Sequence, residues 1–194
     1  MPDLTARIQG ALSGPGGPSS DFDLNKDVSA PNNQLRPAAV LVGIRAESET
    51  VILTKRSARL KHHPGQIAFP GGKRDVDDPC LTSTALREAR EEIGLPRNIV
   101  QTLGTLPPHQ TVTGFQVTPV LALITDHYDP VPELGEVSEV FEVPLHHLIN
   151  PDAFRIEGRR WQGRLRHYYV VPFGPYYIWG ATARILRALA DRMS

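Results

Sequence analysis

The stretch from Gly71 to Leu95, GGKRDVDDPCLTSTALREAREEIGL, restricts the fold more than any other part of this 194-residue chain. Its apolar positions follow a helical period over residues 81–93. Gly94 and Pro96 come directly after that run, as expected where a helix ends. The sequence therefore predicts a helix over 81–93 whose core-facing positions are Leu86, Ala89 and Ile93.

Three glutamates share one face of this predicted helix. Glu88, Glu91 and Glu92 lie at i, i+3 and i+4, within one arc of roughly 100°. Like charges at this spacing destabilise an isolated helix, although Arg87 can offset part of the repulsion by pairing with Glu91. A hard divalent cation among the acids explains the cluster, because Mg²⁺ and Mn²⁺ prefer oxygen ligands. The alternative is a solvated acidic face, which is common for such a run.

Strands are predicted on both sides of the helix. The strand candidates are 37–44, 49–55, 100–106, 117–125 and 137–143, followed by a hairpin of 154–156 with 164–171. A closing amphipathic helix is predicted over 178–193, with Ile178, Ala181, Ile185 and Leu189 on one stripe. Mixed strands with two strong helices indicate an α+β fold.

Residues 1–35 differ from the rest of the chain. Residues 1–12 can form a short amphipathic helix with Leu4, Ile8 and Leu12 at four-residue spacing. Residues 13–34 supply turn formers and little to bury. We therefore expect an N-terminal arm or linker over 1–35 and a compact domain over 36–194. An arm that packs over the core and one that packs over a partner subunit are equally compatible with this pattern.

The composition excludes several classes of protein. Lys plus Arg and Asp plus Glu number 21 each, so the formal net charge is zero and bulk attraction to nucleic acid or an anionic membrane is not expected. The single cysteine, Cys80, rules out an internal disulfide. No apolar run approaches the roughly 18 residues of a spanning helix. We expect a cytoplasmic protein with no nucleic-acid or membrane partner, and a homodimer stays open.

The helix and its approach resemble the Nudix box, G-x5-E-x7-R-E-U-x-E-E-x-G-U, in which U is aliphatic. Residues 87–95 match its second half, with Ala89 at the first U position. The first half departs, because Gly72 lies 15 residues before Arg87 where the pattern has 14, and Asp78 replaces the early glutamate. This departure is the form seen in the coenzyme A pyrophosphatase branch of the family.

A second motif supports that branch. Residues 53–72, LTKRSARLKHHPGQIAFPGG, are similar to its signature LLTxRSxxLxxHxGQxxFPGG, with only the opening leucine displaced by Ile52. Weaker similarities lie at 135–145, a late strand, and at 178–186, the last helix. The resemblance therefore covers roughly 36–192 and leaves the N-terminal arm outside.

The resemblance implies a Nudix-type α/β/α sandwich with a mixed sheet between helices. It also implies hydrolysis of the diphosphate bond of coenzyme A or its thioesters, giving 3′,5′-ADP and 4′-phosphopantetheine or its acyl form. Mg²⁺ or Mn²⁺ would be the cofactor. Its implied ligands are Glu88, Glu92 and the Gly72 carbonyl, with Glu91 sharing them and Arg87 orienting the set.

Two other functions stay open. One is a Nudix hydrolase that acts on another nucleoside diphosphate derivative, such as ADP-ribose. The other is a Nudix-fold binding module without catalysis, although the helix glutamates and Gly72 are intact.

The general base is expected among three glutamates. Glu136 and Glu139 each lie beside a predicted strand start, and family members often use a glutamate of this loop. Glu136 fits best by motif, and Glu91 is the rival.

A cluster of cations precedes the glycine pair, and we expect it to contact phosphates of the substrate. It consists of Lys55, Arg56, Arg59 and Lys61, within seven residues of one another. Arg164 and Arg166 are the second candidates for the 3′-phosphate of coenzyme A. Gln66 and Phe69 are expected to shape the pocket wall, with plain packing as the alternative for Phe69.

Overall fold

The computed structural model describes residues 3–25, 34–161 and 163–193. Its centre is a nine-stranded mixed sheet with the path β1-β7-β8-β2-β3-β4, to which β5 adds on β2, β6 on β8 and β9 on β3. The strands are β1 (Ser19–Ser20), β2 (Arg36–Arg45), β3 (Thr50–Arg56), β4 (Ile67–Ala68), β5 (Gly71–Lys73), β6 (Val100–Thr105), β7 (His109–Gln110), β8 (Phe115–Ile124) and β9 (Val137–Pro144). Long β2 and β8 run parallel in the middle, and β3 and β9 are antiparallel beside them.

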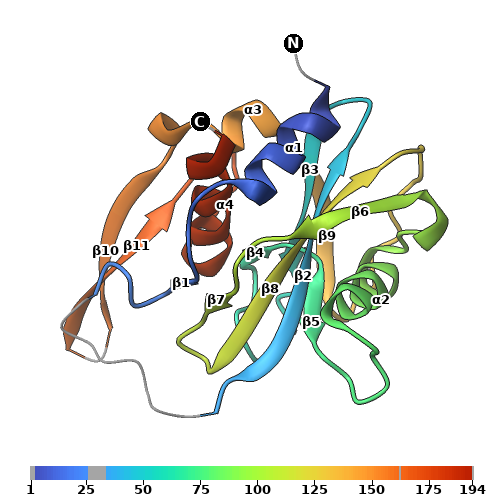
Figure 1. The fold of residues 1–194 in the computed structure, drawn as a ribbon. Coiled ribbons are helices and arrows are strands. Elements are labelled where there is room, and N and C mark those ends of the chain that lie inside the picture. Colours follow the sequence, from blue (N-terminus) through green and yellow to red (C-terminus); the bar gives the residue numbers. More distant parts are fainter. Residues whose placement is uncertain (1–2, 26–33, 162, 194) are drawn as a thin grey trace.

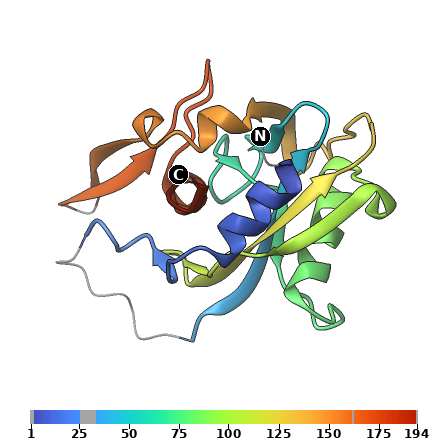
Figure 2. The same cartoon turned by 45° about the horizontal axis from the view of Figure 1, so that its top comes forward.

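Helices cover both faces of this sheet (Figures 1 and 2). On one face α2 (Leu81–Ile93) buries Leu86, Ala89 and Ile93 in a cluster with sheet residues such as Leu41 and Ile52. On the other face lie α1 (Leu4–Ser13), the short α3 (Leu145–Leu148) and α4 (Gly180–Met193). The prediction of an α+β fold with a mixed sheet between helices is confirmed.

A separate two-stranded sheet lies beside α4. It is formed by β10 (Arg155–Trp161) and β11 (Arg164–Val170), which pair antiparallel. This hairpin is longer than the predicted one, because its first strand continues through the arginines to Trp161. The last helix starts at Gly180, later than predicted, because Trp179 still forms a β-bridge with Val170.

The N-terminal segment contacts the core directly. Leu4, Ile8 and Ala11 of α1 belong to the same buried cluster as residues of α4 and the sheet. Arg192 donates to the carbonyl oxygen of Gly14 at 2.7 Å, which ties the end of α1 to α4. Strand β1 then pairs parallel with β7. Residues 26–33 of the expected arm lie outside the described residues, and its division from the domain at residue 35 stays a prediction.

No helix in the described part of the chain is long and apolar enough to cross a membrane.

The packing of α1 leads to a stability prediction. Ile8 is fully buried, so Ile8→Ala is expected to lower the free energy of unfolding by about 2–5 kcal/mol. The exposed neighbour Gln9 is the control, since Gln9→Ala is expected to change it by less than about 0.5 kcal/mol. Urea unfolding of both variants measures the difference, and equal stability would contradict the packing described here.

Candidate active site

Helix α2 brings two of the predicted metal ligands to the end of the β5 segment. Glu92 is only 4% exposed, and its carboxylate accepts a hydrogen bond from the Gly71 backbone N–H at 3.1 Å. Burial raises the pKa of Glu92 to about 8, against the lowering effect of the Gly71 hydrogen bond and with added repulsion from Glu88 and Glu136. Burial also raises the pKa of Glu88. A buried, acid-rich site of this kind favours a bound cation or proton.

Gly72 meets the acids at very close range. A Cβ atom built on Gly72 would lie 2.6 Å from the carboxylate of Glu88. Strand β5 holds this glycine through its pairing with Ala39 of β2. Only a residue without a side chain therefore lets the Glu88 carboxylate rest against this backbone.

A buried ion pair fixes the helix to the loop that precedes it. Arg87 donates from Nε and Nη2 to the two carboxylate oxygens of Asp78, at 3.1 and 3.0 Å. Asp78 also accepts from the Thr84 hydroxyl at 2.9 Å and from the Asp75 backbone N–H at 3.0 Å. These contacts, above all the one with Arg87, hold the pKa of Asp78 well below its usual range. Asp78 is thus a structural anchor for α2.

Arg87 also contacts the helix acids themselves. Its guanidinium lies 3.0 Å from a carboxylate oxygen of Glu88 and 3.0 Å from one of Glu91. The Glu91 side chain is 58% exposed, whereas that of Glu88 is 15% exposed. The three glutamates thus differ: Glu88 and Glu92 face inward, and Glu91 lies at the rim.

The donor set fits a hard divalent cation. It offers carboxylate oxygens that repel one another and lacks sulfur and imidazole donors. These oxygens lie against the backbone of Gly72, where a Cβ atom would have no room. Within 3–25, 34–161 and 163–193, however, no three His, Cys, Asp or Glu side chains converge as a finished metal site. Arg87 instead neutralises Glu88 and Glu91.

The structure separates the two loop candidates for the base. Glu136 lies near enough to Glu88 and Glu92 to raise the pKa of both. The backbone around it is fixed, since the Ser57 N–H donates to the Glu136 carbonyl at 2.8 Å. Glu139 is instead paired in register with Lys55 on β3, and its carboxylate accepts the Tyr176 hydroxyl at 2.5 Å. Of these two loop candidates, Glu136 is thus the one whose charge acts on the helix acids.

The predicted substrate contacts are divided among three environments. Arg56 lies close enough to Glu92 to lower its pKa, and the Nε of Arg56 is buried without a hydrogen-bond partner in the described structure. Lys55, Arg59 and Lys61 are exposed. Gln66 lies beside Gly180 at the start of α4. Phe69 is 3% exposed and belongs to the core cluster, so its ring packs inside the protein.

Sequence reasoning missed two parts of this arrangement. The sequence showed only that Asp78 replaces the early glutamate of the motif. It did not show that Asp78 pairs with Arg87 and fixes α2, because the two residues are nine positions apart. The bond from Tyr176 to Glu139 joins residues 37 positions apart and had no sequence signal.

Comparison with known proteins identifies the class. Residues 34–164 match the family model described as NUDIX domain. The chain therefore belongs to the Nudix family and is a Nudix hydrolase, which acts on diphosphate bonds. Nudix hydrolases generally use divalent metal ions and bind nucleoside diphosphate derivatives.

Two bacterial relatives and one solved structure illustrate the similarity. Proteins named "Uncharacterized Nudix hydrolase NudL" are 44% identical in Pectobacterium atrosepticum, over 84% of this chain and 86% of that protein, and 42% identical in Enterobacter sp., over 80% and 81%. The NUDIX domain of Shewanella oneidensis NrtR, solved with ADP ribose, is 18% identical with a TM-score of 0.51, covering 90% of this chain and 97% of that one. The NrtR comparison supports the fold alone.

The buried Glu92 predicts an unusual pH dependence of stability for the metal-free protein. The Glu92 pKa is about 8 in the folded state and about 4.5 in the unfolded chain, so the folded protein binds more protons between these values. Stability in EDTA is therefore expected to fall as the pH rises from 5 to 8.5, with an upper bound of roughly 4–5 kcal/mol. Glu92→Gln is expected to remove most of this fall. Urea unfolding at both pH values tests it, and an identical pH dependence in both proteins would show that Glu92 does not titrate in this way.

Proposed function

We propose that this Nudix hydrolase cleaves the diphosphate of coenzyme A or its thioesters, giving 3′,5′-ADP and 4′-phosphopantetheine or its acyl form. The observation that carries the proposal is the position of the segment over residues 53–72, which resembles the coenzyme A pyrophosphatase signature. This segment starts in β3, passes Arg56 near Glu92, and ends at Gly72 against Glu88. The signature thus leads directly into the acid site.

We infer that Glu88, Glu92 and the Gly72 carbonyl hold Mg²⁺ or Mn²⁺, with Glu91 at the rim. A cation held by these residues would supply charge neutralisation for the diphosphate oxygens and a lowered pKa for bound water. Arg87 fixes the positions of Glu88 and Glu91 from its anchor on Asp78 and acts as a positioning residue.

We assign the general base to Glu136. Its proximity to Glu88 and Glu92 supports a carboxylate that accepts a proton from the attacking water beside the diphosphate. Glu139 is disfavoured because its carboxylate is already bound by Tyr176. Glu91 is disfavoured by its pairing with Arg87.

Arg56 and the exposed cations of the loop supply the counter-charge for phosphates. The buried Nε of Arg56 has no hydrogen-bond partner within the described structure, so an anion can satisfy it. Lys55, Arg59 and Lys61 contribute from the exposed side of the same segment. A panel of coenzyme A, acetyl-coenzyme A and ADP-ribose, with products identified by mass, tests the substrate class. Faster cleavage of ADP-ribose than of coenzyme A would favour the ADP-ribose alternative.

Glu92→Gln is expected to lower kcat by a factor of about 100 or more in Mg²⁺ or Mn²⁺, because it removes a ligand charge without changing volume. Circular dichroism checks that the fold is kept. A variant that retains more than about a tenth of the wild-type rate, which corresponds to ~1.4 kcal/mol, would remove Glu92 from the ligand set.

Glu136→Gln is expected to lower kcat and kcat/KM together while leaving the metal concentration for half-maximal activity unchanged, because a base acts in the transition state. Glu139→Gln is the matched control in the same segment and is expected to keep most of the rate. A large loss of metal affinity in Glu136→Gln would make it a ligand. An unchanged rate would show that another glutamate acts as the general base.

A further inference from the structure

The hairpin of β10 and β11 concentrates positive charge on one of its faces. Its continuous register places Glu157 opposite Tyr168 and Arg159 opposite Arg166. Directly opposite residues of an antiparallel pair share a face, and successive residues alternate between faces. One face, here called the arginine face, therefore carries Arg155, Arg159, Arg164 and Arg166.

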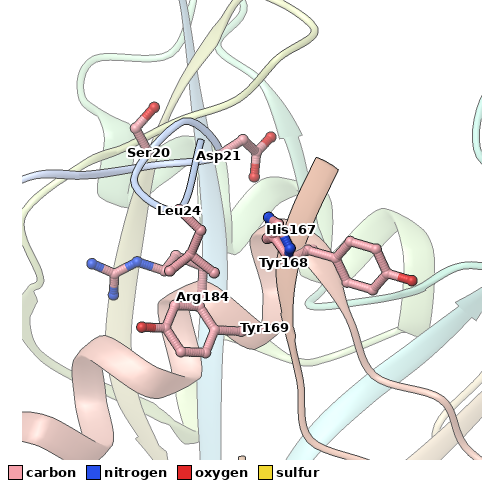
Figure 3. A pocket seen from close by; sticks show the side chains of 8 residues that line it. Ser20, Asp21, Leu24, His167, Tyr168, Tyr169 and Arg184 are labelled. Atoms are coloured by element: carbon pink, nitrogen blue, oxygen red, sulfur yellow. The ribbon is translucent and has the colours of Figure 1, made fainter. Parts of the chain in front are cut away.

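Helix α4 packs against the other face at Tyr169. There the Tyr169 ring lies under the guanidinium groups of Arg184 and Arg187, at 5.6 and 5.9 Å. Figure 3 shows Tyr169 beside Arg184, with the Tyr168 side chain directed to the opposite side of β11. On the arginine face, Arg155, Arg159 and Arg164 are exposed and Arg166 is half-buried. Arg160, which lies opposite Leu165, belongs to the α4 side.

The arginine face carries four arginines against one acid, Glu157, among the described residues. None of its four guanidinium groups pairs with an acid within residues 3–25, 34–161 and 163–193, and the Nε of Arg166 is buried without a hydrogen-bond partner there. Arg159 and Arg166 stand directly opposite each other, which is destabilising for like charges. The acid of this face, Glu157, is bound by the Tyr177 hydroxyl at 2.7 Å. An anion with several oxygens would satisfy both arginines.

An exposed aromatic ring adjoins this face. Tyr177 is 44% exposed, and its hydroxyl also contacts that of Tyr168 at 3.3 Å. Tyr168 in turn lies edge-on to Trp179. The Tyr177 ring is therefore held at its hydroxyl end while much of it stays open. A ring ordered in advance can stack on a nucleobase at low entropic cost.

The segment that carries Tyr177 borders the active site. Its neighbour Tyr176 donates to Glu139, which lies three residues after Glu136. At the other end, the Thr182 hydroxyl donates to the carbonyl of Ile67, which closely follows the cation loop. The segment that carries the ring thus contacts the loop region before and within β9 and the end of the 53–72 segment, and the hydroxyl of Tyr177 joins it to the arginine face through Glu157.

We propose that this surface binds the purine nucleoside end of the substrate, with the base stacked on Tyr177 and a ribose phosphate held by Arg159 and Arg166. The inference rests on the proposed function, since coenzyme A carries a 3′-phosphate on its adenosine. The cations around Arg56 remain available for the diphosphate.

Equilibrium titration with adenosine 3′,5′-bisphosphate and 5′-AMP tests the phosphate contact without turnover, because neither ligand has a diphosphate bond. The wild type is expected to bind the bisphosphate about ten- to a hundredfold more tightly, the size of a charge-assisted contact. Arg159→Gln and Arg166→Gln are expected to reduce this preference about tenfold and to leave 5′-AMP binding nearly unchanged. Arg160→Gln is the matched control, since it removes the same charge from the opposite face.

Tyr177→Leu tests the stacking. It is expected to weaken the binding of both nucleotides by a similar factor, about tenfold. Tyr177→Phe keeps the ring and is expected to keep most of the affinity. Thermal unfolding of each variant identifies a folding defect, and a destabilised Tyr177→Leu would be replaced by Tyr177→Ile in the same comparison.

Three results would overturn the inference. The first is an equal loss of the bisphosphate preference in Arg160→Gln, which would indicate unspecific attraction. The second is unchanged nucleotide binding in Tyr177→Leu. The third is tighter binding of a single-stranded oligonucleotide than of the bisphosphate through the same arginines. A further outcome is that the wild type hydrolyses coenzyme A while both arginine variants keep the bisphosphate preference. That combination would support the proposed function and reject this binding site. Absence of coenzyme A hydrolysis would reject the proposed function, and the titration would still decide on the hairpin.

Discussion

The paired contact between Asp78 and Arg87 is the interaction on which the acid site depends. Asp78 is buried, and a buried carboxylate is costly unless its charge is matched and its oxygens are hydrogen-bonded. Arg87 and Thr84 meet both conditions, and both belong to α2. The helix is therefore fixed to the loop before it, and Glu88 and Glu92 are presented at a defined place.

The second constraint is the contact between the helix and the β5 strand. Gly72 leaves room for the Glu88 carboxylate, and the Gly71 N–H binds that of Glu92. Because β5 is paired with β2, the backbone side of the site is held by the sheet. The opposite side is formed by the loop before β9, whose Glu133 N–H donates to the Glu92 carbonyl at 2.9 Å. Helix, strand and loop thus meet around the buried carboxylate of Glu92 and the half-buried one of Glu88.

Much of the fold followed from local patterns. The helix over 81–93 was predictable because its buried residues repeat at helical spacing and Gly94 adopts the left-handed conformation of a helix cap. The long strands were predictable from apolar runs. The two-residue strands β1, β4 and β7 were not, since runs this short show no alternation of their own and are defined by pairing with another strand. The same limit applies to the site: spacing predicts that three glutamates share a helix face, but only packing decides that Glu92 is buried and Glu91 exposed.

The net charge of zero hides an uneven distribution of charge. Acids gather where α2 meets β5, and four arginines that pair with no acid among the described residues lie on the hairpin, so regions of opposite sign share one neutral chain. The proposed substrate, a diphosphate ester with a further phosphate, matches such a division, because its reacting group would be served by oxygen ligands around a cation and its remote group by guanidinium donors. The composition gives only the summed charge of the two regions. Side chains alternate between the two faces of the hairpin, and the register of β10 with β11 places Arg160 on the face opposite to the other four arginines. That assignment requires the paired strands and cannot be made from composition.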